Sequence, residues 1–224
     1  MDHDESVTRS HGASARLFVA VDPPPEACER LASWARVAVR GLGLRGGASS
    51  PVGVLDPQAL HVTLCFLGER PVAEIDAIAR ALAECAVPVG ELRVGAPVWL
   101  PPRRPRALAV EVHGAPTEDG LIAASGGERG ESLEALHDEL LGALGRACGY
   151  REEKRRFRGH ITLARVRGAY TRGRARARTY GLERPLPPTP ALSFTPGELI
   201  LYRSWLSPEG ASYEAVAKLT LVPQ

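Results

Sequence analysis

The chain has 224 residues, of which 44% are hydrophobic and 24% are charged, and its formal net charge is +2. These values are typical of a soluble globular protein that can bury a substantial core, in one large domain or in two small lobes. No apolar run is long enough to span a membrane, and the first residues do not have the layout of a secretory signal.

Apolar residues recur along the chain at the periods typical of strands and helices. The first helix is expected to begin at Asp22-Pro23, which reads as a cap followed by a first-turn proline. In chain order, we expect a disordered tail over 1–14, a strand over 16–21, a helix to about 40, a strand over 60–67, a helix around 75–85, strands over 92–100 and 107–113, a helix over 133–149, and strands over 159–166, 198–206 and 213–221.

The order of these elements predicts the fold class. Strands outnumber helices and are interleaved with them, which favours an α+β fold with antiparallel sheets over a doubly wound parallel sheet. Each half of the chain contributes a helix, one strand that contains His-x-Thr, and further strands. The sequence therefore predicts two pseudo-symmetric lobes.

Two strands carry the same polar pattern in an otherwise apolar run. The first is His61-Val-Thr63-Leu and the second is His160-Ile-Thr162-Leu, and about 0.03 such matches are expected by chance in a chain of this composition. Since side chains alternate along a strand, each histidine should share a face with the threonine two residues later. One such histidine would be read as a core residue bonded to a neighbouring carbonyl, but two equivalent ones favour a functional pair.

Two imidazoles and two hydroxyls suit chemistry at a phosphate. One imidazole can take a proton from water while the other protonates the departing oxygen on the opposite side of phosphorus. The hydroxyls of Thr63 and Thr162 could hold the non-bridging oxygens. No metal is needed for this division of labour, and the sequence shows no carboxylate cluster that would supply one.

Basic residues surround the second motif. The stretch 151–178 holds eleven Arg and Lys against two Glu, so it carries a charge of about +9. Its density is that of either a solvated face or a surface for a polyanion. Phe157 within it could stack on a base or anchor the core, and Arg103, Arg104 and Arg106 form a second basic group.

The two motifs resemble the signatures of the two-histidine phosphoesterase superfamily, in particular those of the LigT-like RNA 2′,3′-cyclic phosphodiesterases. The stretches "RLFVAV", "LHVTLCFLGE", "RRFRGHITLAR" and "ELILYRSWLSPEGASYEAV" are similar to landmarks of that family and occur in its order. The resemblance covers residues from about 15 to 222, and it implies a single bilobal domain with the active cleft between its lobes.

The resemblance also implies an activity and residue roles. A terminal 2′,3′-cyclic phosphate of RNA would be hydrolysed to the 2′-phosphate, with His61 as proton donor and His160 as proton acceptor. Arg165 resembles a family arginine that could help to hold the phosphate, but strict alternation puts it on the face opposite His160, so it could serve only if the strand ends or bulges there. Gly159 departs from the family, which usually has proline at this position, and a glycine loosens the backbone.

Several expectations complete this interpretation. We expect no cofactor, no metal and no membrane contact, and a monomer that acts on RNA ends or small cyclic nucleotides. The four separate cysteines form no Cys-x-x-Cys pair, which argues against a zinc ribbon or a disulfide framework and for a cytoplasmic protein. The alternatives are a module that binds RNA or a nucleotide without catalysis, and a 2′–5′ RNA ligase or a phosphodiesterase for another small cyclic nucleotide.

Overall fold

The protein is described from a computed structural model, which covers residues 13–43, 51–85, 89–114, 133–151, 156–166, 184–207 and 210–221. Most of the expected tail over 1–14 and most of the basic stretch over 151–178 lie outside the described residues. The single domain expected over 15–222 stays a prediction.

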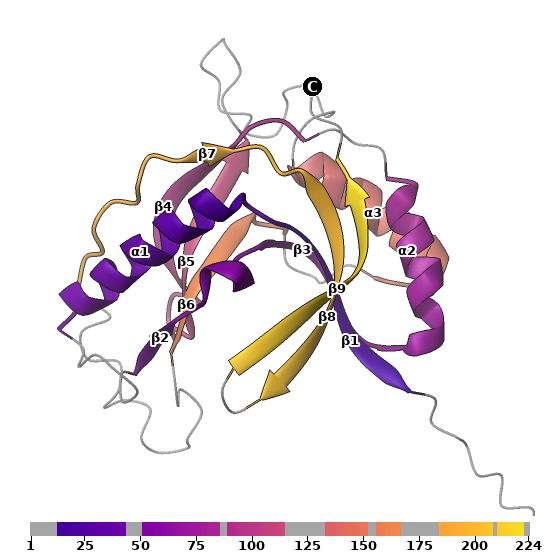
Figure 1. The fold of residues 1–224 in the computed structure, drawn as a ribbon, viewed down its shortest axis with the longest axis horizontal. Helices are drawn as coiled ribbons and strands as arrows, with labels where there is room; N and C mark the ends of the chain where they lie inside the picture. Colours follow the sequence, from indigo (N-terminus) through magenta and orange to yellow (C-terminus); the bar gives the residue numbers. More distant parts are fainter. Residues whose placement is uncertain are drawn as a thin grey trace, which may run out of the picture.

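Strands and helices alternate along the chain as follows (Figure 1). The strands are β1 (Ser14–Val21), β2 (Val52–Val54), β3 (Val62–Pro71), β4 (Leu92–Leu100), β5 (Ala107–Gly114), β6 (His160–Val166), β7 (Ser193–Phe194), β8 (Glu198–Ser207) and β9 (Gly210–Thr220). The helices are α1 (Pro25–Gly41), α2 (Ile75–Ala83) and α3 (Leu133–Cys148), with short 3₁₀ turns at Pro57–Ala59 and Val72–Glu74.

All nine described strands belong to one antiparallel sheet. Its order is β7-β4-β5-β6-β3-β1-β8-β9, and β2 pairs with β6 beside this path. The halves of the sheet meet where β3 pairs with β6 through Val62 and Ile161. The predicted α+β class is therefore confirmed. The two halves of the sheet do not correspond to halves of the sequence, since β8 pairs with β1 and β9 pairs with β8.

The helices cover one face of this sheet, which we call the helix face. Alternate residues of the central strands, such as Leu17, Val62 and Ile161, form one buried cluster with residues of α1, α2 and α3. A smaller cluster joins the end of α1 to β2 and β6. Figure 1 shows α1 on the side of β4, β5 and β6, whereas α2 and α3 lie beyond β1. Among the described residues, no helix has both the length and the apolar character needed to cross a bilayer.

The start of α1 differs from the prediction. Pro24 is the N-cap residue and makes no side-chain cap bond. Asp22 instead accepts a hydrogen bond from the Tyr202 hydroxyl on β8, with 2.6 Å between the oxygens. Asp22 lies one residue beyond β1, so its side chain is directed to a neighbouring strand, and the proline run starts the helix without it.

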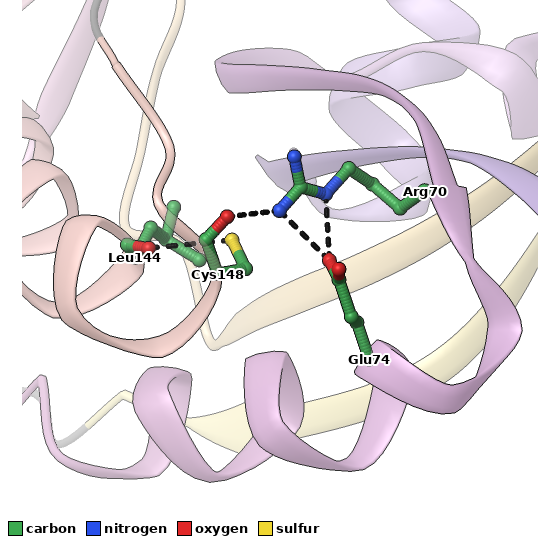
Figure 2. Close-up of polar contacts among 4 residues, drawn as sticks. All are labelled: Arg70, Glu74, Leu144 and Cys148. Atoms are coloured by element: carbon green, nitrogen blue, oxygen red, sulfur yellow. Dashed lines mark hydrogen bonds and ion pairs between the residues drawn. The ribbon is translucent and has the colours of Figure 1, made fainter.

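Arg70 ties the end of β3 to two helices (Figure 2). Its Nε donates to Glu74 Oε2 at 2.9 Å, and its Nη2 lies 2.7 Å from the same oxygen. Nη2 also donates to the backbone carbonyl of Cys148, the last residue of α3. A cation at this position satisfies a helix-end carbonyl and suits the negative end of the helix dipole.

Candidate active site

The two His-x-Thr motifs meet at the junction of β3 and β6. Val62 pairs with Ile161 across this junction, and both side chains are fully buried on the helix face. Their sequence neighbours therefore point to the other face, which we call the motif face. In an antiparallel ladder this register sets His61 beside Thr162 and Thr63 beside His160. The fold thus brings the predicted residues together, and all four are partly buried.

A β-bulge follows each motif at the same position. On β3, Thr63 pairs with Ala20 and Cys65 with Val19, so Leu64 has no partner on β1. On β6, Thr162 pairs with Ala109 and Ala164 with Leu108, so Leu163 has no partner on β5. Each bulge inserts one residue and reverses the alternation of the side chains directly after it.

The bulge on β6 moves Arg165 to the motif face. Arg165 pairs with Ala107, which shares a face with Ala109 and therefore with Thr162. Strict alternation would put Arg165 on the face opposite His160, but the strand bulges here, which is the condition under which Arg165 was expected to reach the site. Arg165 is exposed, and its charge acts on His61. It therefore belongs to the same group as the two histidines.

The bulge on β3 has the matching effect. Cys65, which alternation would put beside His61 and Thr63, is buried in the core of the helix face. Phe66 then turns to the motif face, where it pairs with Phe18 and is 53% exposed. Phe66 and Arg165 hold equivalent positions, each three residues after the threonine of its motif.

Both imidazoles are anchored in the same way. His61 Nδ1 lies 2.9 Å from the carbonyl oxygen of Ala59, and His160 Nδ1 lies 2.9 Å from that of Arg158. Because a carbonyl only accepts, Nδ1 must carry the hydrogen in each ring. In the neutral rings Nε2 is thus unprotonated and can accept a proton, and in the charged rings it can donate one.

Aromatic side chains surround His61. Its ring centroid lies 4.9 Å from that of Phe18 and 5.2 Å from that of Tyr213, with the latter edge-on. Tyr202 stacks on Phe18 at 5.1 Å and is held by its hydrogen bond to Asp22. These four residues were not predicted as part of the site. Alternation along β1 would have put Phe18 on the motif face, but no sequence pattern brings β8 and β9 next to it.

This setting changes the protonation of His61. Desolvation by burial, together with smaller contributions from the charges of Arg165 and His160, lowers the pKa of His61 to about 4. The hydrogen bond from Nδ1 to Ala59 acts in the opposite direction. The unliganded protein therefore holds His61 neutral at pH 7, with Nε2 unprotonated.

The start of β6 is tightly packed, contrary to the loosening expected from Gly159. A Cβ atom built on Gly159 would lie 2.8 Å from the carbonyl oxygen of Val112 and 3.1 Å from Leu133 Cδ1. The Gly159 carbonyl also accepts a hydrogen bond from Val112 N at 2.9 Å. Glycine is thus the residue that lets β6 approach β5 directly before His160.

The described members of the two predicted basic groups lie at opposite ends of β6. Arg103 and Arg104 are exposed in the loop that leads into β5, whose first residue pairs with Arg165. Arg156 and Arg158 precede the other end of β6 and are exposed as well. The two groups therefore flank the motifs on two sides.

Phe157 packs into the core and does not project toward the motif face. It lies against the buried cluster and stacks on His137, with 4.4 Å between ring centroids. His137 is 6% exposed, so this histidine of α3 faces the core. The His137 side chain points from α3 toward Phe157 in the segment that precedes β6.

Within the described ranges, no group of three or more His, Cys, Asp or Glu side chains is arranged to hold a metal ion. The chemical groups of the predicted site residues on the motif face are two imidazoles with available Nε2 atoms, two hydroxyls and one guanidinium. Together they could bind an anion and transfer protons to and from it.

A family model and a related protein of known activity both match this chain. A family model described as the 2′-5′ RNA ligase superfamily matches residues 18–204. An RNA 2′,3′-cyclic phosphodiesterase of Thermus thermophilus is 30% identical over 209 residues, which is 92% of this chain and 90% of that protein. The matched region contains both motifs and most of the sheet.

Solved structures share the fold. LigT of E. coli, solved with 3′-AMP, has a TM-score of 0.66 at 23% identity, covering 94% of this chain and 99% of that one. A protein solved as a phosphoesterase has a TM-score of 0.67 at 23% identity, covering 95% and 100%. The curled antiparallel sheet with few helices is therefore the LigT-like fold.

Proposed function

Because the chain belongs to the 2′-5′ RNA ligase superfamily, we propose that it hydrolyses the 2′,3′-cyclic phosphate at an RNA end to a 2′-phosphate. The observation that carries this proposal is the pairing of Val62 with Ile161, which sets the two His-x-Thr motifs side by side on one face. The name of the Thermus thermophilus relative, an RNA 2′,3′-cyclic phosphodiesterase, supports the same substrate.

In the proposed reaction, a water oxygen attacks phosphorus and the bond from phosphorus to O3′ breaks. His160 Nε2 takes the proton of the water, and His61 Nε2 donates a proton to O3′. Thr63, Thr162 and Arg165 hold the non-bridging oxygens of the phosphate. The products are a 2′-phosphate and a free 3′-hydroxyl, and solvent restores both imidazoles. No metal ion takes part in this scheme.

Because the pKa of His61 is low, the bound substrate takes part in the protonation of this histidine. With a pKa of about 4, His61 is neutral before substrate binds and has no proton to donate. A bound phosphodiester is an anion, and its charge offsets that of Arg165. We expect substrate binding to draw a proton onto His61, so that the donor forms only in the complex.

The first experiment is product analysis on the four nucleoside 2′,3′-cyclic phosphates in the presence of a chelator. We expect 2′-phosphates from the wild type, and losses of about 10²- to 10⁴-fold in kcat for His61→Ala and His160→Ala. His137→Gln is the control, because His137 lies on α3, which packs on the helix face of the sheet and not on the motif face. Full activity in either alanine variant, or loss of activity with the chelator, would contradict the mechanism.

A second substrate separates the roles of the two histidines. A nucleoside p-nitrophenyl phosphodiester releases p-nitrophenolate, which leaves without needing a proton. On this substrate His61→Ala should recover most of its lost activity, whereas His160→Ala should not, since water still needs a base. The reverse pattern would mean that the donor and acceptor roles are exchanged.

Two other functions fit parts of the site. A binding module without catalysis would use the threonines and arginines, but it gives no reason for two imidazoles with available Nε2 atoms. Salt-dependent RNA binding without any product would favour it. A 2′–5′ ligase or a phosphodiesterase for a small cyclic nucleotide would use the same groups, with a ribose hydroxyl in place of water in the ligase. Assays with those substrates decide between them.

We also place the protein in the reducing cytosol, as a monomer. Cys28, Cys65, Cys85 and Cys148 are all described, and none is in a disulfide. Thiols outside any disulfide suit a compartment that keeps cysteine reduced.

A further inference from the structure

A carboxylate lies next to one of the two imidazoles. Glu111 on β5 pairs directly with His160 on β6, so the two side chains are cross-strand neighbours on the motif face. Directly opposed residues of this kind have Cβ atoms about 4.5 to 5.5 Å apart. Glu111 is partly buried, with 35% of its side chain exposed. Nothing in the His-x-Thr pattern predicts an acidic residue at this position.

The surroundings of Glu111 hold it in this place. His113, two residues further along β5, puts its Nε2 atom 3.6 Å from Glu111 Oε2. On the neighbouring strand, a Cβ atom on Gly95 would lie 2.9 Å from two ring atoms of His113 and 3.3 Å from Glu111 Cβ. The β4 register also shifts between Val94 and Pro97. A glycine at this irregular point therefore makes the room that both side chains occupy.

We propose that Glu111 is a positioning residue for His160, whose negative charge stabilises the imidazolium formed when His160 takes the proton of water. This inference rests on the proposed function. Among the described residues, the charged and titratable groups near His160 are Glu111 and His113 from β5, His61 from the other motif, and Arg158 and Arg165 from its own segment. Glu111 is the acidic member of this set and can offset the cations.

The same charge should have opposite effects on binding and on catalysis. An anionic phosphodiester next to His160 is repelled by Glu111 in the ground state, so the carboxylate weakens substrate binding. Once His160 becomes a cation, the carboxylate favours it. A side chain that only filled space would not produce this combination.

Glu111→Gln tests the inference, because it removes the charge and keeps the shape. In steady-state assays on a nucleoside 2′,3′-cyclic phosphate at low salt, we expect kcat to fall about 10-fold and KM to fall about 3-fold. Glu111→Asp keeps the charge and should stay near the wild type. The matched control is Glu214→Gln, which removes an exposed carboxylate on β9. An unchanged kcat, or a KM that rises, would overturn the proposal.

Binding of an anion that cannot be turned over provides a readout that does not need catalysis. In Glu111→Gln, inorganic phosphate should bind about 3-fold more tightly at low salt than in the wild type, and Glu111→Asp and Glu214→Gln should show no change. Unchanged phosphate binding in Glu111→Gln overturns the inference about Glu111. A wild type without turnover contradicts the proposed hydrolysis instead, so the two failures are distinguishable.

Discussion

His61 and His160 share one anchoring geometry and have different surroundings. Each donates from Nδ1 to the carbonyl two residues earlier, which fixes the same tautomer in both rings. His61 is packed among aromatic rings, whereas His160 faces Glu111 across the strand pair. The repeated motif therefore sets the orientation of each ring, and residues outside the motif set its environment.

The depressed pKa of His61 predicts a loss of stability in mild acid. His61 has a pKa of about 4 in the folded protein against 6.5 for an exposed histidine, so the unfolded chain takes up the proton first as the pH falls. This contribution to the free energy of unfolding is present above about pH 6.5. It decreases steadily as the pH falls below that value and is lost once the pH has fallen through about 4. We expect about 2 kcal/mol of it to be lost by pH 5.

Urea unfolding at pH 7.5 and pH 5, compared between the wild type and His61→Gln, measures this contribution. Glutamine does not titrate, so the variant should lose about 2 kcal/mol less between the two pH values than the wild type. An identical pH dependence in both proteins would show that His61 is not buried as described.

Among the elements, the β-bulges decide which side chains reach the site. The alternation within His61-Val-Thr63 and within His160-Ile-Thr162 was predicted from the sequence, because it concerns neighbouring residues of one strand. The sides taken by Cys65 and Arg165 could not be predicted in the same way. An inserted residue is defined by the partner strand, and the sequence of β3 or β6 alone does not contain that information.

Other differences have similar causes. β2 and β7 have three and two residues, which is too short for any periodicity to be recognised. The aromatic residues around His61 and the carboxylate beside His160 come from strands distant in sequence, so only the folded sheet puts them there. The longer strands and all three helices were predicted well, since each carries a full apolar period.

The start of β6 should not tolerate a side chain at residue 159. In Gly159→Ala, the new Cβ would meet the Val112 carbonyl at 2.8 Å, so β6 must shift away from β5. Relieving such overpacking typically costs about 1 to 3 kcal/mol. The shift also moves the next residue, His160, so kcat should fall about 10-fold or more.

Thermal unfolding and steady-state kinetics of Gly159→Ala test this prediction, with Gly197→Ala as the control, because a Cβ on Gly197 meets no atom within 4 Å. A variant with wild-type stability and rate would mean that β5 and β6 are not held this closely.

At the scale of the whole molecule, the nine described strands form one sheet with two halves. β1, β8 and β9 lie in the half that contains β3, whereas β2, β4, β5 and β7 lie in the half that contains β6. The motifs lie at the inner edges of the halves, where the sheet is continuous. Basic residues lie beyond both ends of β6, and this arrangement suggests where an RNA chain would continue.

Arg103 and Arg104 are expected to contact RNA phosphates beyond the terminal nucleotide, because their loop enters β5 beside Arg165. In Arg103→Gln/Arg104→Gln, kcat/KM for an oligonucleotide with a cyclic phosphate end should fall about 10-fold at low salt, and its dependence on salt should weaken. A mononucleoside 2′,3′-cyclic phosphate lacks those phosphates, so its turnover should stay within about twofold of the wild type.

The control is Arg36→Gln/Arg40→Gln, which removes two exposed arginines from α1. Equal losses on the oligonucleotide and the mononucleoside would contradict this path. So would an effect confined to Arg156→Gln/Arg158→Gln, which would put the RNA at the other end of β6.

The matching bulges give Phe66 and Arg165 equivalent positions on the two strands that carry the motifs. Phe66 is an apolar ring and Arg165 is a permanent cation, so the two ends of the site differ chemically although the two strands bulge at equivalent positions. A ligand bound in the reverse orientation would meet the wrong one of these two side chains at each end of the site. Swapping these two side chains would reverse that polarity without moving either imidazole.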